Sequence, residues 1–100
     1  MEKYNKLVRD NIPDILDKKG VSYEKRIAND DEYKVELIKK LREEVDEFME
    51  AADIEELADI LEVIDSILGL EEYKNVRIIQ SEKRFKRGGF DKRIILKGEK

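Results

Sequence analysis

The stretch LREEVDEFMEAADIEELADIL, residues 41–61, contains nine acidic residues, and four of them form two pairs that lie symmetrically about one point: Glu44, Glu47, Glu56 and Asp59. Within each pair the residues are three apart, and the midpoint of the set falls between residues 51 and 52. Side chains three apart share a helix face, with Cβ atoms about 5–6 Å apart. If two helices meet in a tight turn at residues 51–53, the pairs come into register. The stretch therefore predicts an antiparallel helical hairpin whose four carboxylates converge on one pocket.

Apolar residues extend both helices beyond this stretch. Upstream they recur at spacings of three and four, which predicts a helix over residues 32–52. Asp53 is a favourable N-cap for a second helix, which we expect to end at Gly69. Glu56 lies three residues after Asp53, as in a capping box, so a capping role is the alternative to a ligand role for its carboxylate.

The rest of the chain gives weaker signals. Asn11 and Pro13 indicate the start of a short helix that stops at Gly20, and a third helix is expected over residues 71–86. Residues 21–27 and 92–97 are weak strand candidates, or extended segments. The fold class is thus all-α, an antiparallel hairpin or bundle with at most short extended segments near the termini. We expect residues 1–100 to form a single domain.

Composition limits the chemistry of the chain. It contains no Cys and no His, which excludes disulfides, thiolate nucleophiles, imidazole bases and the usual zinc sites. Catalysis would depend on carboxylates, Lys, Arg, Tyr or a metal. No apolar stretch approaches the roughly 20 residues of a membrane span, and the first residues have no apolar signal core. We expect a soluble, cytoplasmic protein.

Charge is unevenly distributed along the chain. Residues 30–65 contain 15 acidic and 4 basic residues, whereas residues 74–100 contain 10 basic and 3 acidic residues. An acidic centre beside a basic tail suits a substrate that is itself anionic. The alternative is that charged helices are common and that the tail merely offsets the middle.

Four carboxylates in one pocket require cations to neutralise them. An acidic set of oxygen ligands favours Mg²⁺, Mn²⁺ or Ca²⁺. The alternative is a solvated helix face, on which a Lys40–Glu44 pair would be worth only a few tenths of a kcal/mol. Glu62 and Asp65 repeat the ExxD spacing, but their mirror positions in the first helix are apolar, so they cannot face Glu44 and Glu47 in the same hairpin. They would form a solvated face, or contribute to the outer shell of the site if the turn is longer.

KLREEVDE (residues 40–47) followed by EELAD (residues 55–59) resembles the signature of the MazG-like all-α nucleoside triphosphate pyrophosphohydrolases. Their pattern is ExxE and then ExxD on two antiparallel helices, matched here by the four carboxylates, often with a preceding Lys, matched by Lys40. YNKLVRDNIP (residues 4–13) and KRGGFDKRI (residues 86–94) resemble a subgroup labelled phosphoribosyl-ATP pyrophosphohydrolase-like. The spacer between Glu47 and Glu56, eight residues, is shorter than that family usually shows.

The resemblance implies Mg²⁺-dependent cleavage between the α- and β-phosphates of a nucleotide, with Mn²⁺ as a possible substitute. Glu44, Glu47, Glu56 and Asp59 would be the metal ligands, with Glu44 or Glu47 able to act instead as general base. Lys40, Lys83, Arg84 and Arg87 would bind the phosphates of a small-molecule nucleotide; for the last three, a solvated basic helix end is an equal alternative. The resemblance also implies a homo-oligomer, a dimer or larger. Arg9 and Asp10 are interpreted as a structural pair rather than a substrate contact.

Two other functions are compatible with the sequence. The first is a non-enzymatic helical interaction module, such as a regulatory dimer, whose acidic helices would be only surface. The second is a nucleic-acid binder that uses the basic tail. The net charge of −4, the 7% aromatic content and the lack of a binding motif argue against a nucleic-acid polymer, and we expect no membrane partner either.

Overall fold

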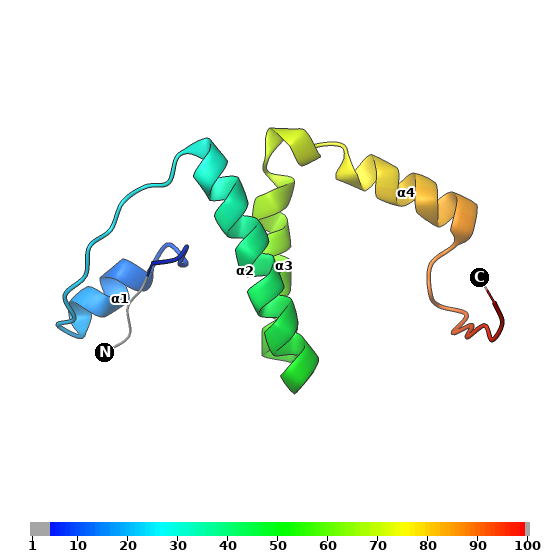
Figure 1. Ribbon diagram of the computed structural model, residues 1–100, viewed down its shortest axis with the longest axis horizontal. Helices are drawn as coiled ribbons and strands as arrows, with labels where there is room; N and C mark the ends of the chain where they lie inside the picture. The colour runs from blue at the N-terminus through cyan, green and yellow to red at the C-terminus, as the bar shows by residue number, and fades with distance from the viewer. Residues whose placement is uncertain (1–4, 100) are drawn as a thin grey trace.

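The computed structural model describes residues 5–99, and within that range every regular element is helical. The elements in chain order are α1 (Ile12–Lys18), α2 (Asp30–Ala51), α3 (Ile54–Leu68), the 3₁₀ turn η1 (Glu71–Tyr73) and α4 (Val76–Arg87). Helices α2 and α3 lie side by side and antiparallel at the centre, with α1 and α4 on opposite sides of them (Figure 1). The predicted all-α fold with a central hairpin is confirmed. Tyr4, the first residue of the YNKLVRDNIP segment, and Lys100, in the basic tail, lie outside the described residues.

Side-chain caps fix where the two central helices begin. The Asn29 side chain accepts a hydrogen bond from the backbone N–H of Glu32, and that of Asp53 accepts one from the N–H of Glu56, each at 2.9 Å. Between the helices only Ala52 and Asp53 lie outside helical structure, and Ala52 adopts a left-handed conformation with φ of 50°. The predicted turn therefore forms without Gly or Pro, and its shortness holds α2 and α3 in one register.

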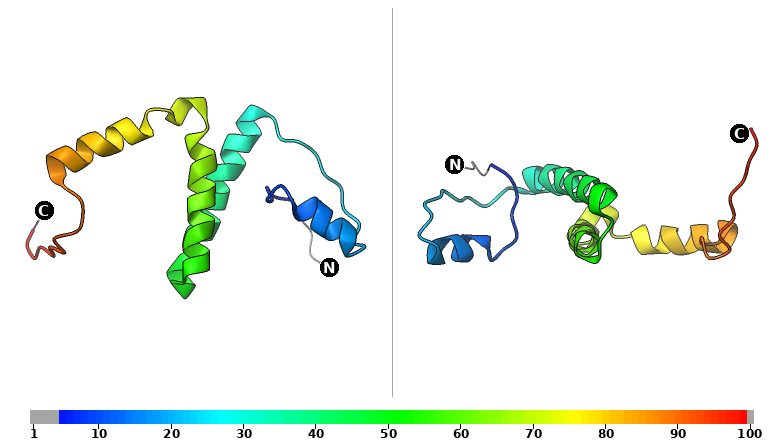
Figure 2. Two further views of the ribbon diagram at one scale, coloured as in Figure 1. Left: turned by 180° about the vertical axis from the view of Figure 1, so that it is seen from behind. Right: turned by 90° about the horizontal axis from the view of Figure 1, so that it is seen from below.

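The apolar core lies between α2 and α3 and is small. Leu37 and Val63, one from each helix, are the buried apolar residues of the described chain, at 3% and 8% exposure. The radius of gyration is 18.1 Å, whereas a compact domain of this length has about 13 Å. The excess comes from α1 and α4, which extend away from the hairpin (Figure 2).

Two sequence expectations differ from the structure. The helix expected over residues 71–86 is divided, because η1 ends at Tyr73 and α4 begins only at Val76. No strand forms among residues 5–99, and the two strand candidates lie in irregular segments. A single extended segment leaves its backbone groups without partners, so it becomes a strand only when another segment pairs with it. In the described part of the chain, no helix is both long and apolar enough to cross a membrane.

Candidate metal centre

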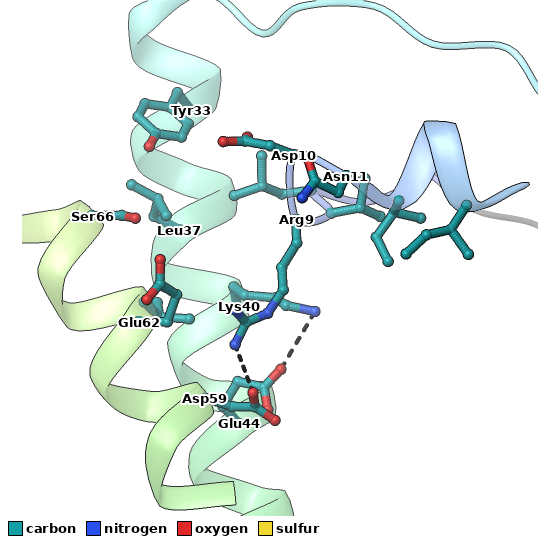
Figure 3. A pocket seen from close by; sticks show the side chains of 15 residues that line it. Arg9, Asp10, Asn11, Tyr33, Leu37, Lys40, Glu44, Asp59, Glu62 and Ser66 are labelled. Carbon is teal, nitrogen blue, oxygen red and sulfur yellow. Dashed lines mark hydrogen bonds and ion pairs between the residues drawn. The ribbon is translucent and has the colours of Figure 1, made fainter. Parts of the chain in front are cut away.

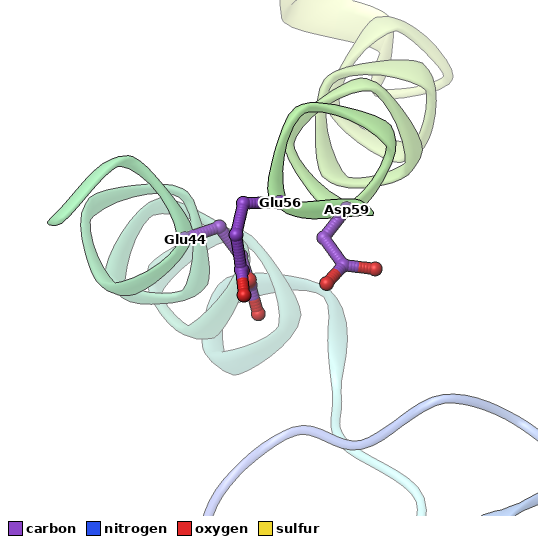
Figure 4. Close-up of side chains that lie close together, drawn as sticks. All are labelled: Glu44, Glu56 and Asp59. Atoms are coloured by element: carbon purple, nitrogen blue, oxygen red, sulfur yellow. The ribbon is translucent and has the colours of Figure 1, made fainter. Parts of the chain in front are cut away.

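Three of the four predicted carboxylates meet in the structure. Glu44 on α2 and Glu56 and Asp59 on α3 each offer an oxygen, and these oxygens all lie within 4.8 Å of one another. Figure 4 shows the three side chains reaching, from the two helices, toward the same side of the hairpin. The spacing of three on α3 and the short turn produce this convergence, as the sequence predicts. Oxygens from both helices can therefore hold one cation between them.

The carboxylate of Glu44 is buried without full compensation. Glu44 is 6% exposed, and its Oε2 atom has no hydrogen-bond partner among the described residues. The same is true of Oε2 of the partly buried Glu56. Burying an unpaired carboxylate oxygen is costly, and a cation is the ligand that removes this cost. As the capping alternative, the carboxylate of Glu56 would accept a hydrogen bond from the backbone N–H of Asp53. Among the described residues only the reverse bond forms, from the N–H of Glu56 to Asp53 Oδ1, so capping does not account for this oxygen.

Glu47, the fourth predicted ligand, lies beside the cluster and is exposed. The pKa of Glu44 is raised from its ordinary value, first by burial and then by the neighbouring carboxylate of Glu47 and its negative charge; the charge of Lys40 lowers it and that of Asp59 raises it. Glu47 is therefore close enough to Glu44 to affect its protonation. Its position suits a group that contacts water at the edge of the site, and its role as ligand or base stays a prediction.

Two cations already contact the cluster. Arg9 Nη2 lies 2.7 Å from Asp59 Oδ1, and Lys40 Nζ lies 3.5 Å from Glu44 Oε1 (Figure 3). The Lys40 side chain is only 21% exposed, and that of Glu44 only 9%. The Lys40–Glu44 pair is thus not the solvated surface pair that was the alternative interpretation of the sequence. It places a predicted phosphate-binding residue next to the carboxylates.

A cavity of about 570 Å³ adjoins the cluster. It lies between the N-terminal segment, here residues 5–11, on one side and helices α2 and α3 on the other (Figure 3). Glu44, Asp59, Arg9 and Lys40 line its charged part, and the apolar lining comprises Leu7, Val8, Ile12, Ile15, Leu37 and Val63. Small-molecule sites in proteins typically measure about 300–1,000 Å³. The volume of the cavity therefore lies within the range of small-molecule sites.

Glu62 and Asp65 lie outside the carboxylate cluster, as the sequence predicts. Glu62 nevertheless lines the cavity one turn beyond Asp59, whereas Asp65 does not line it. The cavity extends past the cluster because the N-terminal segment forms one of its walls. Arg9 was interpreted as pairing with Asp10, but it pairs with Asp59, 50 residues away. The signal that could have suggested a role at the site is that Arg9 lies in YNKLVRDNIP, one of the segments that resemble the family.

The predicted phosphate-binding residues of the tail lie elsewhere. Lys83, Arg84 and Arg87 are exposed on α4, which leads away from the hairpin (Figure 1), and none of them lines the cavity. Arg84 lies 3.4 Å from Asp91 in the following segment. Their predicted contact with phosphates therefore stays a prediction, and it would need a second copy of the chain to bring α4 to a site.

Comparison with family models, with curated proteins and with solved structures found no match to this chain. The function must therefore be inferred from its own residues and their geometry.

Metal addition is expected to stabilise the fold. Millimolar Mg²⁺ or Mn²⁺ should raise the melting temperature at neutral pH, because a cation relieves the repulsion among Glu44, Glu56 and Asp59. A ligand present at 100 times its Kd adds about 2.7 kcal/mol of stability. Thermal melts of the wild type and of Glu50→Gln, an exposed position on the same helix, should shift alike. A melting temperature indifferent to both metals would contradict a metal centre here.

The rise in melting temperature that metal causes should also depend on pH, and the protonation of Glu44 determines in which direction. Its raised pKa means that the folded state holds a proton more tightly than the unfolded chain. In metal-free protein, this group therefore contributes stability below its unfolded pKa and loses it as the pH rises through the folded pKa. Metal requires the deprotonated carboxylate, so metal stabilisation should grow over that same interval. Parallel melts across acidic to neutral pH, with and without Mn²⁺, measure both trends.

Proposed function

We propose that this protein is a MazG-like, divalent-metal-dependent nucleotide pyrophosphohydrolase. It would cleave a nucleoside triphosphate, or a related nucleotide, between the α- and β-phosphates to give a monophosphate and pyrophosphate. The observation that carries the proposal is the buried, unpartnered Oε2 of Glu44 within a carboxylate cluster that opens onto a nucleotide-sized cavity. The resemblance of the two acidic segments to the family signature supports the same reaction.

The donor set indicates the metal class. Glu44, Glu56 and Asp59 provide only carboxylate oxygens, which suit Mg²⁺ and Mn²⁺ rather than zinc or copper. Such a cation, when bound, lowers the pKa of a water molecule and stabilises charge on phosphate oxygens. Glu47, exposed beside Glu44, would accept the proton of the attacking water as general base. Lys40, which lines the cavity next to Glu44, would bind the phosphates.

The bonds and protons of the proposed reaction can be accounted for with these residues. The water oxygen forms a bond to one phosphorus while the bridging P–O bond breaks, and pyrophosphate or the monophosphate leaves with the bonding electrons. The water proton passes to a carboxylate, which is the available base in a chain without His or Cys. The apolar wall of the cavity, including Leu37 and Val63, would cover the nucleoside and exclude solvent from it.

We further propose that the protein works as a homodimer or larger assembly of identical chains. Large apolar side chains on α4 and the tail are almost fully exposed in the single chain, among them Phe85 at 93%, Phe90 at 96% and Leu96 at 90%. A helical interaction module would also present such a surface. It would have no need, however, to bury the unpartnered carboxylate of Glu44. The carboxylate cluster thus favours the enzyme over the interaction module.

A nucleotide screen tests the proposed reaction. Purified protein is incubated with Mg²⁺ and each canonical or modified nucleoside triphosphate, and the products are separated by ion-exchange chromatography. We expect monophosphate and pyrophosphate in equal amounts for at least one nucleotide, because the cleaved bond is the α–β bond. Glu44→Gln prepared in the same way controls for a contaminating hydrolase. Release of orthophosphate, or no product from any nucleotide, would contradict the proposal.

A further inference from the structure

We propose that Arg9 is a phosphate-binding residue of this site, which leaves Asp59 when a divalent cation takes that carboxylate. The inference rests on the proposed function, and it assigns a role to a residue for which the acidic motif makes no provision. Arg9 Nη2 lies 2.7 Å from Asp59 Oδ1, and Asp59 belongs to the carboxylate cluster. Figure 3 shows the guanidinium of Arg9 reaching from the N-terminal segment down to the cluster.

Arg9 and a metal ion compete for the same carboxylate. The side chains of Arg9 and Asp59 are 57% and 39% exposed, and an ion pair so open to water is weak and readily exchanged. A cation held by the buried Glu44 together with Glu56 and Asp59 has three oxygens instead of one. Metal binding therefore displaces the guanidinium, and the positive charge of the ion repels it from the cluster.

The displaced guanidinium remains at the cavity because its backbone is anchored. The carbonyl of Arg9 accepts a hydrogen bond from the N–H of Ile12 at 3.1 Å, in the turn that begins α1. Lys6 in the same segment lies 3.3 Å from Glu43 on α2. Only the Arg9 side chain needs to rotate. The segment thus keeps the guanidinium beside the place where the phosphates of a substrate would lie.

Guanidinium chemistry suits that second position. Its planar fork binds phosphate through two parallel hydrogen bonds, which Lys cannot reproduce. Asp10 and Glu62 also line the cavity and are the other anions that a released Arg9 can meet. A phosphate chain carries more charge than either carboxylate, so substrate is the stronger partner. Arg9 would then pair with Asp59 before metal and substrate bind, and with a phosphate of the substrate afterwards.

Two binding measurements with opposite expected signs test this exchange. Mn²⁺ alone is titrated by calorimetry, and radiolabelled pyrophosphate is followed by equilibrium dialysis with free Mn²⁺ held constant. Arg9→Gln should tighten Mn²⁺ binding by about two- to fivefold, because its competitor for Asp59 is lost. The same variant should weaken pyrophosphate binding by at least about tenfold. Arg9→Lys should fall between the wild type and Arg9→Gln in both measurements.

Lys6→Gln is the matched control, since among the described residues it removes the other ion pair between the N-terminal segment and the hairpin. We expect less than about a twofold change in either affinity. A purely structural role for Arg9 predicts that Arg9→Gln weakens both ligands or neither, and either result would overturn the inference. Wild-type protein that binds no Mn²⁺ would overturn the proposed function and this inference together. Binding of both ligands by the wild type, with an indifferent Arg9→Gln, would overturn the inference alone.

Discussion

Glu44→Gln is expected to lower kcat/KM by about 10²–10³-fold or more, the cost of losing a ligand that holds a Lewis-acidic ion. The amide nearly keeps the shape of the side chain, so the fold should survive. In metal-free protein at neutral pH the variant should be no less stable than the wild type. The charge that it removes is buried, and burial raises the pKa of Glu44 because it disfavours the ionised carboxylate. Steady-state kinetics and melts with and without Mn²⁺ measure the two effects. Glu50→Gln, exposed on the same helix, should behave as the wild type.

Acidic residues of α3 provide the matched comparison. Glu56→Gln and Asp59→Asn should each cause a loss of the same order as Glu44→Gln, whereas Asp65→Asn should have little effect, because Asp65 is exposed and outside the cavity. Glu62→Gln should fall between them, since Glu62 lines the cavity without joining the cluster. An inactive Asp65→Asn beside active Glu56 and Asp59 variants would mean that the hairpin register is wrong.

The second large effect concerns assembly. The wild type is expected to be at least a dimer at micromolar concentration, and Phe85→Glu should convert it to monomers. Phe85 is 93% exposed in the single chain, and burying a Phe side chain contributes about 1.5–3 kcal/mol, counted once for each copy in a symmetric interface. Light scattering coupled to size exclusion measures the mass. Glu82→Gln, a neutralising change on the same helix, should leave the mass unchanged, and a monomeric wild type would refute the assembly.

Assembly also decides what the basic residues of α4 do. If Lys83, Arg84 and Arg87 serve the site of a partner copy, a triple Gln variant and Glu44→Gln should each be inactive alone. Mixed under conditions that exchange subunits, they should regain part of the activity, because some sites then combine an intact cluster with an intact α4. No recovery, with mixed assemblies shown by mass, would remove these residues from the substrate site.

The hairpin was predictable because its determinants are local. Spacings of three and four, the Asp53 cap and Gly69 define two helices, and the short turn then fixes which carboxylates face each other. Contacts set by the path of the N-terminal segment were not predictable in this way. The Arg9–Asp59 pair and the cavity position of Glu62 depend on residues about fifty positions apart, whose approach no local pattern encodes. The surface that α4 contacts in an assembly was equally unpredictable, because no local pattern tells what the exposed apolar side chains of an amphipathic helix pack against.

The two-residue connection at Ala52 and Asp53 has a consequence for insertions and deletions in this chain. If one extra residue there were taken up into the start of α3, Asp59 would move by about 100° about the helix axis, off the face that meets Glu44. Substitution is far less demanding, because a φ of 50° at residue 52 is open to Gly and Asn as well as to Ala. The length of this connection is therefore more tightly constrained than its composition. A longer spacer that extends the helices preserves the cluster when it adds whole turns to both of them, about seven residues for one turn on each.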